Sequence, residues 1–171
     1  MTPVDAPEAP ATRIADPNSE VVRLFGDHGP SLYRFCHSML GPGDDAEDVV
    51  QESFLRLLQH LQASGDRANL RAWLFTVAAN GCRDRLRRRK RWVPWLPELD
   101  RRTSEPDSAK RDIDGAWTVL RDLAPRDRLL LSLRAQGLSY ADMARAADIR
   151  PASVGRLLAR AVDRWKKKVG A

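Results

Sequence analysis

Residues 139–158 carry the pattern of a helix-turn-helix, in which two short helices cross at a set angle. The stretch is SYADMARAADIRPASVGRLL. Ser139 suits the N-cap of a first helix over 140–147, and Pro151 suits the first position of a second. Asp148 stands at the turn position that needs a positive φ, which Asp tolerates better than most residues. The alternative is an ordinary helical hairpin, but small, apolar and capping residues agree at several positions.

The second helix of this pattern has an apolar face and a polar face. In helix-turn-helix proteins, residues near the start of the second helix reach base edges in the major groove, and flanking groups hold phosphates. Arg156 is therefore predicted to bond a guanine, and Arg160 with the lysines at 166–168 to contact phosphates. For the lysines, a solvated tail is an equal alternative. The predicted DNA-contacting residues of this helix are Ser153, Arg156, Arg160 and Arg164.

Positive charge is concentrated in two blocks of the chain. The net charge is +6, yet residues 83–91 alone hold seven Arg and Lys residues against one Asp. A second basic block covers 156–168. Each block lies at the end of a predicted helix with a periodic apolar face. Burial of that face would fix the direction in which the basic side chains point. Because neutralising phosphates releases counterions, a nucleic-acid partner is expected.

The amino-terminal half is predicted to be helical after a tail. Residues 1–18 are rich in proline and lack periodicity, so we expect a disordered tail. A helical pattern begins at Ser19, and Pro30 is expected to break or kink it into two helices. Two further helices are predicted over 45–62 and 70–91. The apolar positions expected to be buried in the first pattern are Val22, Phe25, Leu32, Phe35, Cys36 and Met39.

Between these helices and the helix-turn-helix, the apolar residues no longer recur at helical spacing. Residues 92–111 contain several prolines and mixed charges, which indicates an extended linker. Helical pattern returns from 112, and no strand-like alternation is found. The expected fold is all-α, with two small helical domains over 19–91 and 112–171 joined by that linker.

The two middle helices have distinctive exposed faces. On the 70–91 helix the face opposite the core carries Thr76, Asn80, Arg83 and Arg87. An amide among arginines suits base-edge hydrogen bonding, although a merely solvated Asn80 is the alternative. Asp84 is expected to pair with Arg87 or Arg88. The 45–62 helix instead exposes Asp48, Gln51 and Glu52, which favours a protein partner, or else simple complementarity to the helix dipole.

Cysteine and histidine usage indicates no cofactor or metal. Cys36 and Cys82 have no Cys or His neighbours at ligand spacing, so both are expected to be small hydrophobic residues in or near the core. No signal peptide and no apolar run of membrane-spanning length is present. A cytoplasmic protein without membrane insertion is therefore expected.

Three strings together resemble the extracytoplasmic-function (ECF) sigma factors of bacterial RNA polymerase. The region from 32 to 91 contains LYRFCHSMLGPGDDAEDVVQESFLRLLQHL and LRAWLFTVAANGCRDRLRRRKR, which resemble sigma region two. The region from 120 to 161 is LRDLAPRDRLLLSLRAQGLSYADMARAADIRPASVGRLLARA, which resembles region four. The combination is specific to the family, whereas each string alone is weak.

The resemblance implies a function and its residues. Core RNA polymerase would be bound, with Asp48, Gln51 and Glu52 on the clamp helices of its β′ subunit and region four on the β flap. Loop 62–69 and the following helix would recognise and open the minus-ten element of promoter DNA, flipping a base into a pocket. The linker would pass through the polymerase channels, and an anti-sigma factor is an expected partner. The implied minus-ten residues are Thr76, Asn80, Arg83, Arg87 and Arg88, and region four would read the minus-thirty-five element.

The recognition helix departs from the family's common pattern. Gly155 stands where a basic residue is usual, and Arg156 replaces a small one, so promoter preference does not transfer from relatives. Two other functions are weighed against a sigma factor. One is a stand-alone dimeric helix-turn-helix regulator, which needs a dimer interface that the sequence does not display. The other is a DNA-processing enzyme with metal on the acidic residues 44–48, which lack a facing ligand.

Overall fold

The computed structural model describes residues 16–92 and 117–170, and every regular element in those ranges is a helix. This confirms the all-α fold. A short helical segment over 117–120 precedes α5. The longer helices are α1 (Pro17–Leu40), α2 (Asp45–Gln62), α3 (Leu70–Trp92), α5 (Pro125–Ala135), α6 (Tyr140–Ala147) and α7 (Pro151–Val169).

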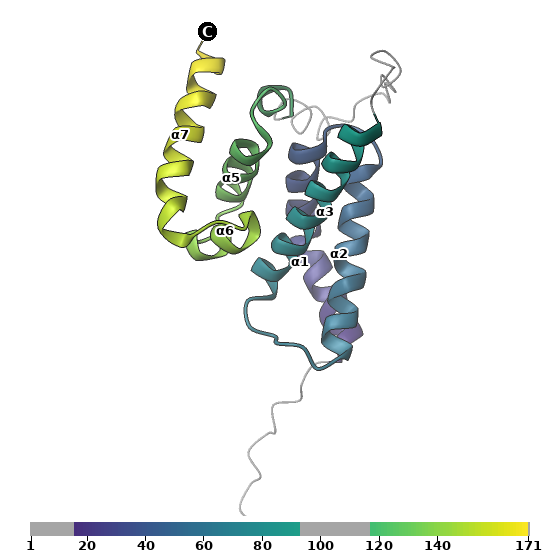
Figure 1. Cartoon of the computed structure of the whole chain (residues 1–171). Helices are drawn as coiled ribbons and strands as arrows, with labels where there is room; N and C mark the ends of the chain where they lie inside the picture. Colours follow the sequence, from purple (N-terminus) through teal and green to yellow (C-terminus); the bar gives the residue numbers. More distant parts are fainter. Residues whose placement is uncertain (1–15, 93–116, 171) are drawn as a thin grey trace, which may run out of the picture.

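Helices α1, α2 and α3 form a three-helix bundle (Figure 1). The expected helix over 45–62 has the observed bounds, and the expected helix over 70–91 is one residue longer. Edge-on contacts between Phe35 and Phe75, with ring centroids 5.4 Å apart, join α1 to α3. Both rings are fully buried, so this pair lies at the centre of the bundle core.

Helix α1 corrects two predictions. Pro30 lies inside one continuous helix and does not divide it. A proline removes one backbone hydrogen bond and crowds the carbonyl of the residue four before it; here that residue is Gly26, whose surroundings are open. The continuous helix places Val22 and Phe25 outward, 73% and 54% exposed, while Leu24 occupies the core instead.

Helices α5, α6 and α7 form the second unit, and α6 with α7 is the predicted helix-turn-helix. The Ser139 hydroxyl accepts a hydrogen bond from the backbone of Asp142, as an N-cap should. Asp148 adopts the left-handed conformation with φ 54°. Pro151 opens α7. Local sequence thus determines both helices and the turn between them.

The two units pack directly against each other. Helix α5 lies beside α1, and α6 lies beside α3 (Figure 1). Buried apolar residues of both units belong to one continuous core. The sequence predicted two lobes on a linker but no contact between them, so this interface is a finding of the tertiary structure.

Some predicted segments lie outside the described residues. These are the linker over 92–111, apart from its first residue, and most of the tail over 1–18. Helix α1 begins at Pro17, so the tail prediction extended two residues into the helix. The domain boundaries stay predictions.

Candidate nucleic-acid interface

The outward face of α7 carries the predicted DNA-contacting residues. Val154, Leu158 and Ala161 are buried against α5 and α6. Because the helix repeats every 3.6 residues, the opposite face holds Arg156 and Arg160, both exposed. Ser153 is half-buried at the start of that face. The first turns of α7 thus present two guanidinium groups to solvent.

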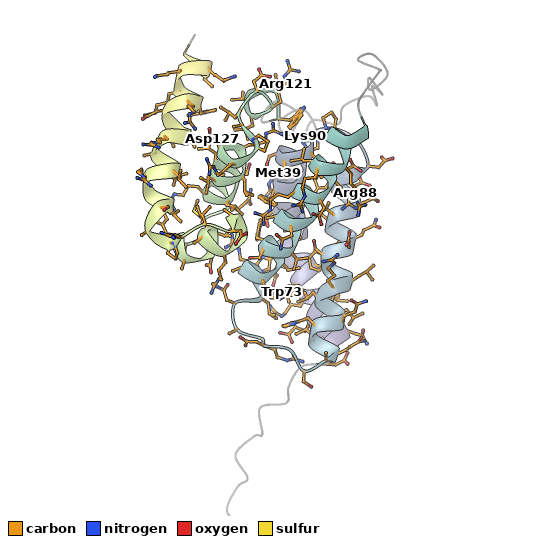
Figure 2. The ribbon with its side chains drawn as sticks, viewed as in Figure 1. Met39, Trp73, Arg88, Lys90, Arg121 and Asp127 are labelled. Carbon is orange, nitrogen blue, oxygen red and sulfur yellow. The ribbon has the colours of Figure 1, made fainter. Side chains whose placement is uncertain are left out.

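Farther along α7, basic side chains are bonded within the protein. Arg164 Nη1 donates to Asp127 Oδ2 at 2.6 Å, and Asp127 of α5 is buried. Lys168 donates to the backbone carbonyl of Asp122 at 2.9 Å. Figure 2 shows Asp127 on α5, on the side near α7. These bonds hold the end of α7 on α5 and on the turn that precedes α5, so Arg164 already has a structural partner.

The predicted minus-ten residues of α3 fall into three environments. The half-buried Thr76 donates its hydroxyl to the Ala72 carbonyl. Asn80 is exposed and accepts a hydrogen bond from Arg83. Arg87 and Arg88 are exposed toward the end of the helix, and Figure 2 shows Arg88 near the side of α2. The face is therefore only partly open to a ligand.

Two charged side chains of α3 have defined partners. Asp84 forms the expected ion pair with Arg87, and that hydrogen bond lowers the pKa of Asp84. Arg83 Nη2 also donates to the backbone carbonyl of Ala146, in α6, at 3.0 Å. Arg83 thus bridges its own helix and the helix-turn-helix.

The packing of α3 differs from the predicted apolar stripe. The apolar spacing of the sequence from Leu70 predicts a buried stripe that includes Trp73 and Val77, but both side chains are half-buried in the structure. Because α3 lies between α1 and α2 on one side and α6 on another, it buries a wider surface than a stripe. Its buried residues are Leu70, Ala72, Leu74, Phe75, Ala78, Ala79 and Cys82.

The acidic face of α2 is mostly exposed. Asp48 and Gln51 face solvent, and Glu52 is half-buried. Glu52 pairs with Arg56 at 2.5 Å and with Arg85 of α3 at 3.5 Å. This pairing connects the acidic face of α2 to the basic helix α3.

The start of α2 is held by ion pairs with α3. Asp44 is the N-cap residue, a position that Asp favours, but its side chain makes no capping hydrogen bond. Asp45 Oδ2 instead accepts from Arg89 Nη2 at 2.6 Å. A surface pocket of about 380 Å³ is lined here by Asp45, Asp48, Arg85, Arg88 and Arg89. Three guanidinium groups against two carboxylates make it a poor cation site.

No metal cluster and no membrane-spanning helix is found among the described residues. Groups of three or more His, Cys, Asp or Glu side chains able to hold a metal are absent from 16–92 and 117–170. Within the same ranges no helix is both long and apolar enough to cross a bilayer.

Both cysteines are buried, as expected. Cys36 of α1 and Cys82 of α3 are fully enclosed and not disulfide-bonded. Burial, together with a hydrogen bond that the Cys36 thiol donates to Cys82, raises the pKa of Cys36. Because the thiolate is the reactive form, this thiol is held in its inert state.

Asn69 contributes to the site and was not singled out from the sequence. It stands before α3 with φ 52°, and its side-chain carbonyl accepts from the backbone of Ala72 at 3.2 Å. Its amide donates to Asp142 of α6 at 3.1 Å. An Asn directly before a helix is a capping signal, so its position was readable, whereas its contact with α6 was not.

Arg128 is the other residue that the sequence did not reveal. This buried side chain of α5 donates to the carbonyls of Met39, Arg121 and Leu123. Its guanidinium lies 4.8 Å from the centre of the Trp117 ring. Burial lowers its pKa. Arg128 thus joins α1 to the segment leading into α5, and nothing local in the sequence signals that role.

Comparison with known protein families gives a consistent result. A profile described as Sigma-70 region 2 matches residues 24–92. The ECF RNA polymerase sigma factor EcfG of Rhodopseudomonas palustris is 34% identical over 146 residues, which cover 83% of this chain and 78% of that protein. SigL of Mycobacterium tuberculosis, another ECF sigma factor, is 37% identical over 110 residues, covering 64% of this chain and 56% of SigL.

Two solved structures share the fold. CnrH in complex with the cytosolic domain of CnrY has a TM-score of 0.69, with 22% identity over 90% of this chain and 89% of that one. The sigma factor RpoE of Bartonella quintana, in complex with the anti-sigma factor NepR, has a TM-score of 0.67, with 22% identity over 90% and 98% of the two chains. At this identity the likeness establishes the fold.

Proposed function

The chain belongs to the ECF sigma factors of RNA polymerase, and we propose that it works through three surfaces. These are an acidic polymerase-binding face on α2, a minus-ten face on α3 and a minus-thirty-five face on α7. As a sigma factor it directs transcription initiation. The observation that carries the proposal is the separation of exposed charge: acidic residues on α2, basic residues on α3 and α7. We assign it binding and no catalysis, in the cytoplasm where polymerase acts.

The polymerase-binding face consists of Asp48, Gln51 and Glu52. Two of them are exposed, and Glu52 is held by Arg56 and Arg85. Its ion pairs restrain the Glu52 carboxylate, so less side-chain entropy is lost when a partner binds. A negative face in a protein of net charge +6 repels DNA and favours a basic protein surface. The β′ clamp helices are the proposed contact.

The minus-ten face comprises Thr76, Asn80, Arg83, Arg87 and Arg88 of α3. Asn80 has the amide chemistry for a base edge, and the exposed Arg87 and Arg88 suit the phosphates of a separated strand. Loop 62–69 adjoins the start of this helix. The proposal places strand opening there, with a base flipped out of the stack.

The minus-thirty-five face is the start of α7. Arg156 and Arg160 are exposed on it, and Ser153 lies one turn before Arg156. We assign base contact to Arg156 and phosphate contact to Arg160. Arg164 belongs to this face by position, but its bond to Asp127 makes it the weakest contributor.

Run-off transcription with sigma-free core polymerase on genomic DNA tests the proposal. The purified chain should confer defined start sites. Asp48→Ala with Glu52→Ala should weaken core binding tenfold or more and leave binding of the free chain to minus-thirty-five duplex unchanged. Glu47→Ala on the same helix is the matched control. Undiminished core binding by the double variant would remove the α2 face from the proposal.

A second pair of variants separates base from phosphate contact. Arg156→Ala should weaken binding to the preferred duplex by about 1–3 kcal/mol and relax preference at one base pair. Arg160→Ala should weaken binding to all sequences alike. It should also reduce the slope of log affinity against log salt concentration by about one, because one phosphate contact is lost. If Arg156→Ala weakens every duplex equally, its base-contacting role is wrong.

An inhibitory protein partner is part of the proposal. RpoE of Bartonella quintana was solved with an anti-sigma factor, and the same fold here supports a partner of that class. The stand-alone dimeric regulator is not favoured, since the relatives are polymerase sigma factors. Pull-down with the purified chain as bait, with and without added core polymerase, tests for a competing partner.

A further inference from the structure

Loop 62–69, to which the proposed function gives strand opening, has a defined shape. The backbone N–H groups of Ser64 and Gly65 donate to carbonyls near the end of α2, at 3.2 and 2.8 Å. Ser64 adopts a left-handed conformation with φ 57°. Farther along, Asp66 Oδ1 accepts a hydrogen bond from the backbone of Ala68 at 2.8 Å. The loop is thus bonded within the chain at several points.

The ring of His60, in the last turn of α2, lies beneath this loop. Its Nε2 is 2.8 Å from the carbonyl oxygen of Asp66, and because a carbonyl only accepts, the ring nitrogen is the donor. The ring also stacks on Trp73 of α3, with centroids 4.8 Å apart and planes at 27°. Figure 2 shows Trp73 near the start of α3. One side chain therefore connects the end of α2, the loop and the start of α3.

Gly65 passes so close to the His60 ring that no side chain fits between them. A Cβ added to Gly65 would lie 2.3–2.5 Å from three atoms of the ring, well inside the separation at which non-bonded heavy atoms attract. The Gly65 amide also donates to the backbone carbonyl of His60. The ring therefore fills the space under the loop, and the loop folds directly over it.

The loop has another anchor on α1. Arg67 forms an ion pair with Glu20, whose side chain is only 12% exposed. Together with His60 and Trp73, these groups belong to α1, α2 and α3 or to the loop between α2 and α3. The contacts that shape the loop around His60 therefore do not depend on where α5, α6 and α7 lie.

The ordered loop presents polar side chains to solvent. Ser64 and Asp66 are both exposed, and a hydroxyl and a carboxylate can bond the edge of an unstacked base. Loop residues that are already fixed lose less conformational entropy when they bind. A fixed loop also cannot rearrange to satisfy a wrong base, so its shape contributes to base preference as well as to affinity.

We propose that His60 is a positioning residue for minus-ten recognition, whose ring holds loop 62–69 in the shape that presents Ser64 and Asp66 to a flipped base. The ring acts through its bond to the Asp66 carbonyl and its contact with Gly65, and it does not itself touch DNA. The inference rests on the proposed function of the loop and adds a residue outside the loop that sets its base preference.

Two substitutions remove the ring from the loop by different routes. His60→Ala deletes it, and Gly65→Ala displaces it through the added Cβ. Run-off transcription with core polymerase first identifies the minus-ten sequence. Binding of the assembled holoenzyme to single-stranded non-template oligonucleotides, with each base varied in turn, is then measured. Either variant should reduce the preference at one position by about fivefold or more and leave core binding unchanged. Gln59→Ala, exposed on the same turn of α2, is the control and should keep the wild-type preference.

The double variant provides the sharper test. With the ring gone, the Cβ at position 65 has room, so His60→Ala with Gly65→Ala should lose no more preference than His60→Ala alone. Additive losses would overturn the proposal, because the two residues would then act separately.

The remaining outcomes separate positioning from a general structural role. An equal loss of affinity for all four bases, or an unchanged base preference in folded His60→Ala, contradicts the proposal. Far-ultraviolet circular dichroism establishes folding, and Gly65→Ala carries the same test if His60→Ala does not fold. If the wild-type protein gives no start sites with core polymerase, the proposed function fails instead, so the two failures are distinguishable.

Discussion

Replacing Gly41 by alanine should destabilise the protein at the junction of its two units. Gly41 ends α1 with φ 82° and ψ −170°, a backbone region that is essentially restricted to glycine. A Cβ added there would lie 2.6 Å from the ring of Trp117. The substitution therefore has two separable costs, one in the backbone and one in the contact with the ring.

The magnitude follows from these two costs. Holding alanine in this conformation costs about 1–3 kcal/mol. Displacing the Trp117 ring also disturbs its stacking with Arg128, at 4.8 Å, for roughly 1 kcal/mol more. We expect Gly41→Ala to lower the free energy of unfolding by about 3 kcal/mol.

Urea unfolding of four proteins measures both costs. These are the wild type, Gly41→Ala, Trp117→Ala and the double variant, followed by far-ultraviolet circular dichroism. Without the ring the glycine substitution should cost about 1 kcal/mol less, and this difference is the coupling energy. Gly26→Ala is the control: its site is open, so the variant should gain about 0.5–1 kcal/mol. Zero coupling between positions 41 and 117 would refute the reasoning.

Three further outcomes are expected. Gly155→Ala should stabilise α7 by up to about 1 kcal/mol in thermal unfolding, because the added Cβ would meet only Tyr140 at an ordinary 3.6 Å. Burial opposes ionisation of Asp142, but hydrogen bonds from Ser139, Arg145 and Asn69 outweigh it and lower its pKa. Its contribution to stability is therefore present at neutral pH and lost as pH falls below about 4; the difference in unfolding free energy between wild type and Asp142→Asn should shrink on acidification. Finally, neither Cys36 nor Cys82 should react with an aromatic disulfide reagent at neutral pH until denaturant is added, since both thiols are enclosed; rapid labelling of the native protein would contradict this.

Local sequence signals predicted the elements well where their causes are local. The Ser139 cap, the left-handed Asp148 and the bounds of α2 all follow from interactions within a few residues, and the structure confirms them. Pro30 was predicted wrongly because its local cost is outweighed by burial of Leu24 and Leu32 on either side. A proline penalty is local, whereas the packing that opposes it is not.

The candidate site was predictable as a set of residues but not as an arrangement. Residue type and helical period identified Asn80 and Arg83 on one face of α3 and Arg156 on α7. That Arg83 is bonded to α6, and that Arg164 is bonded to Asp127, depends on partners 63 and 37 residues away. No periodicity within one helix encodes such distances.

The amino-acid sequence by itself determined the helical class, the helix-turn-helix and the family, because caps, turn residues and apolar periodicity act within single elements. Only the tertiary structure decided that the two units close on each other. The pairing of Ser38 with Ser132 and of Arg128 with the Met39 carbonyl joins residues that are 94 and 89 positions apart. Such contacts arise only when the helices have been placed in three dimensions, since shape and buried polar groups select the partners.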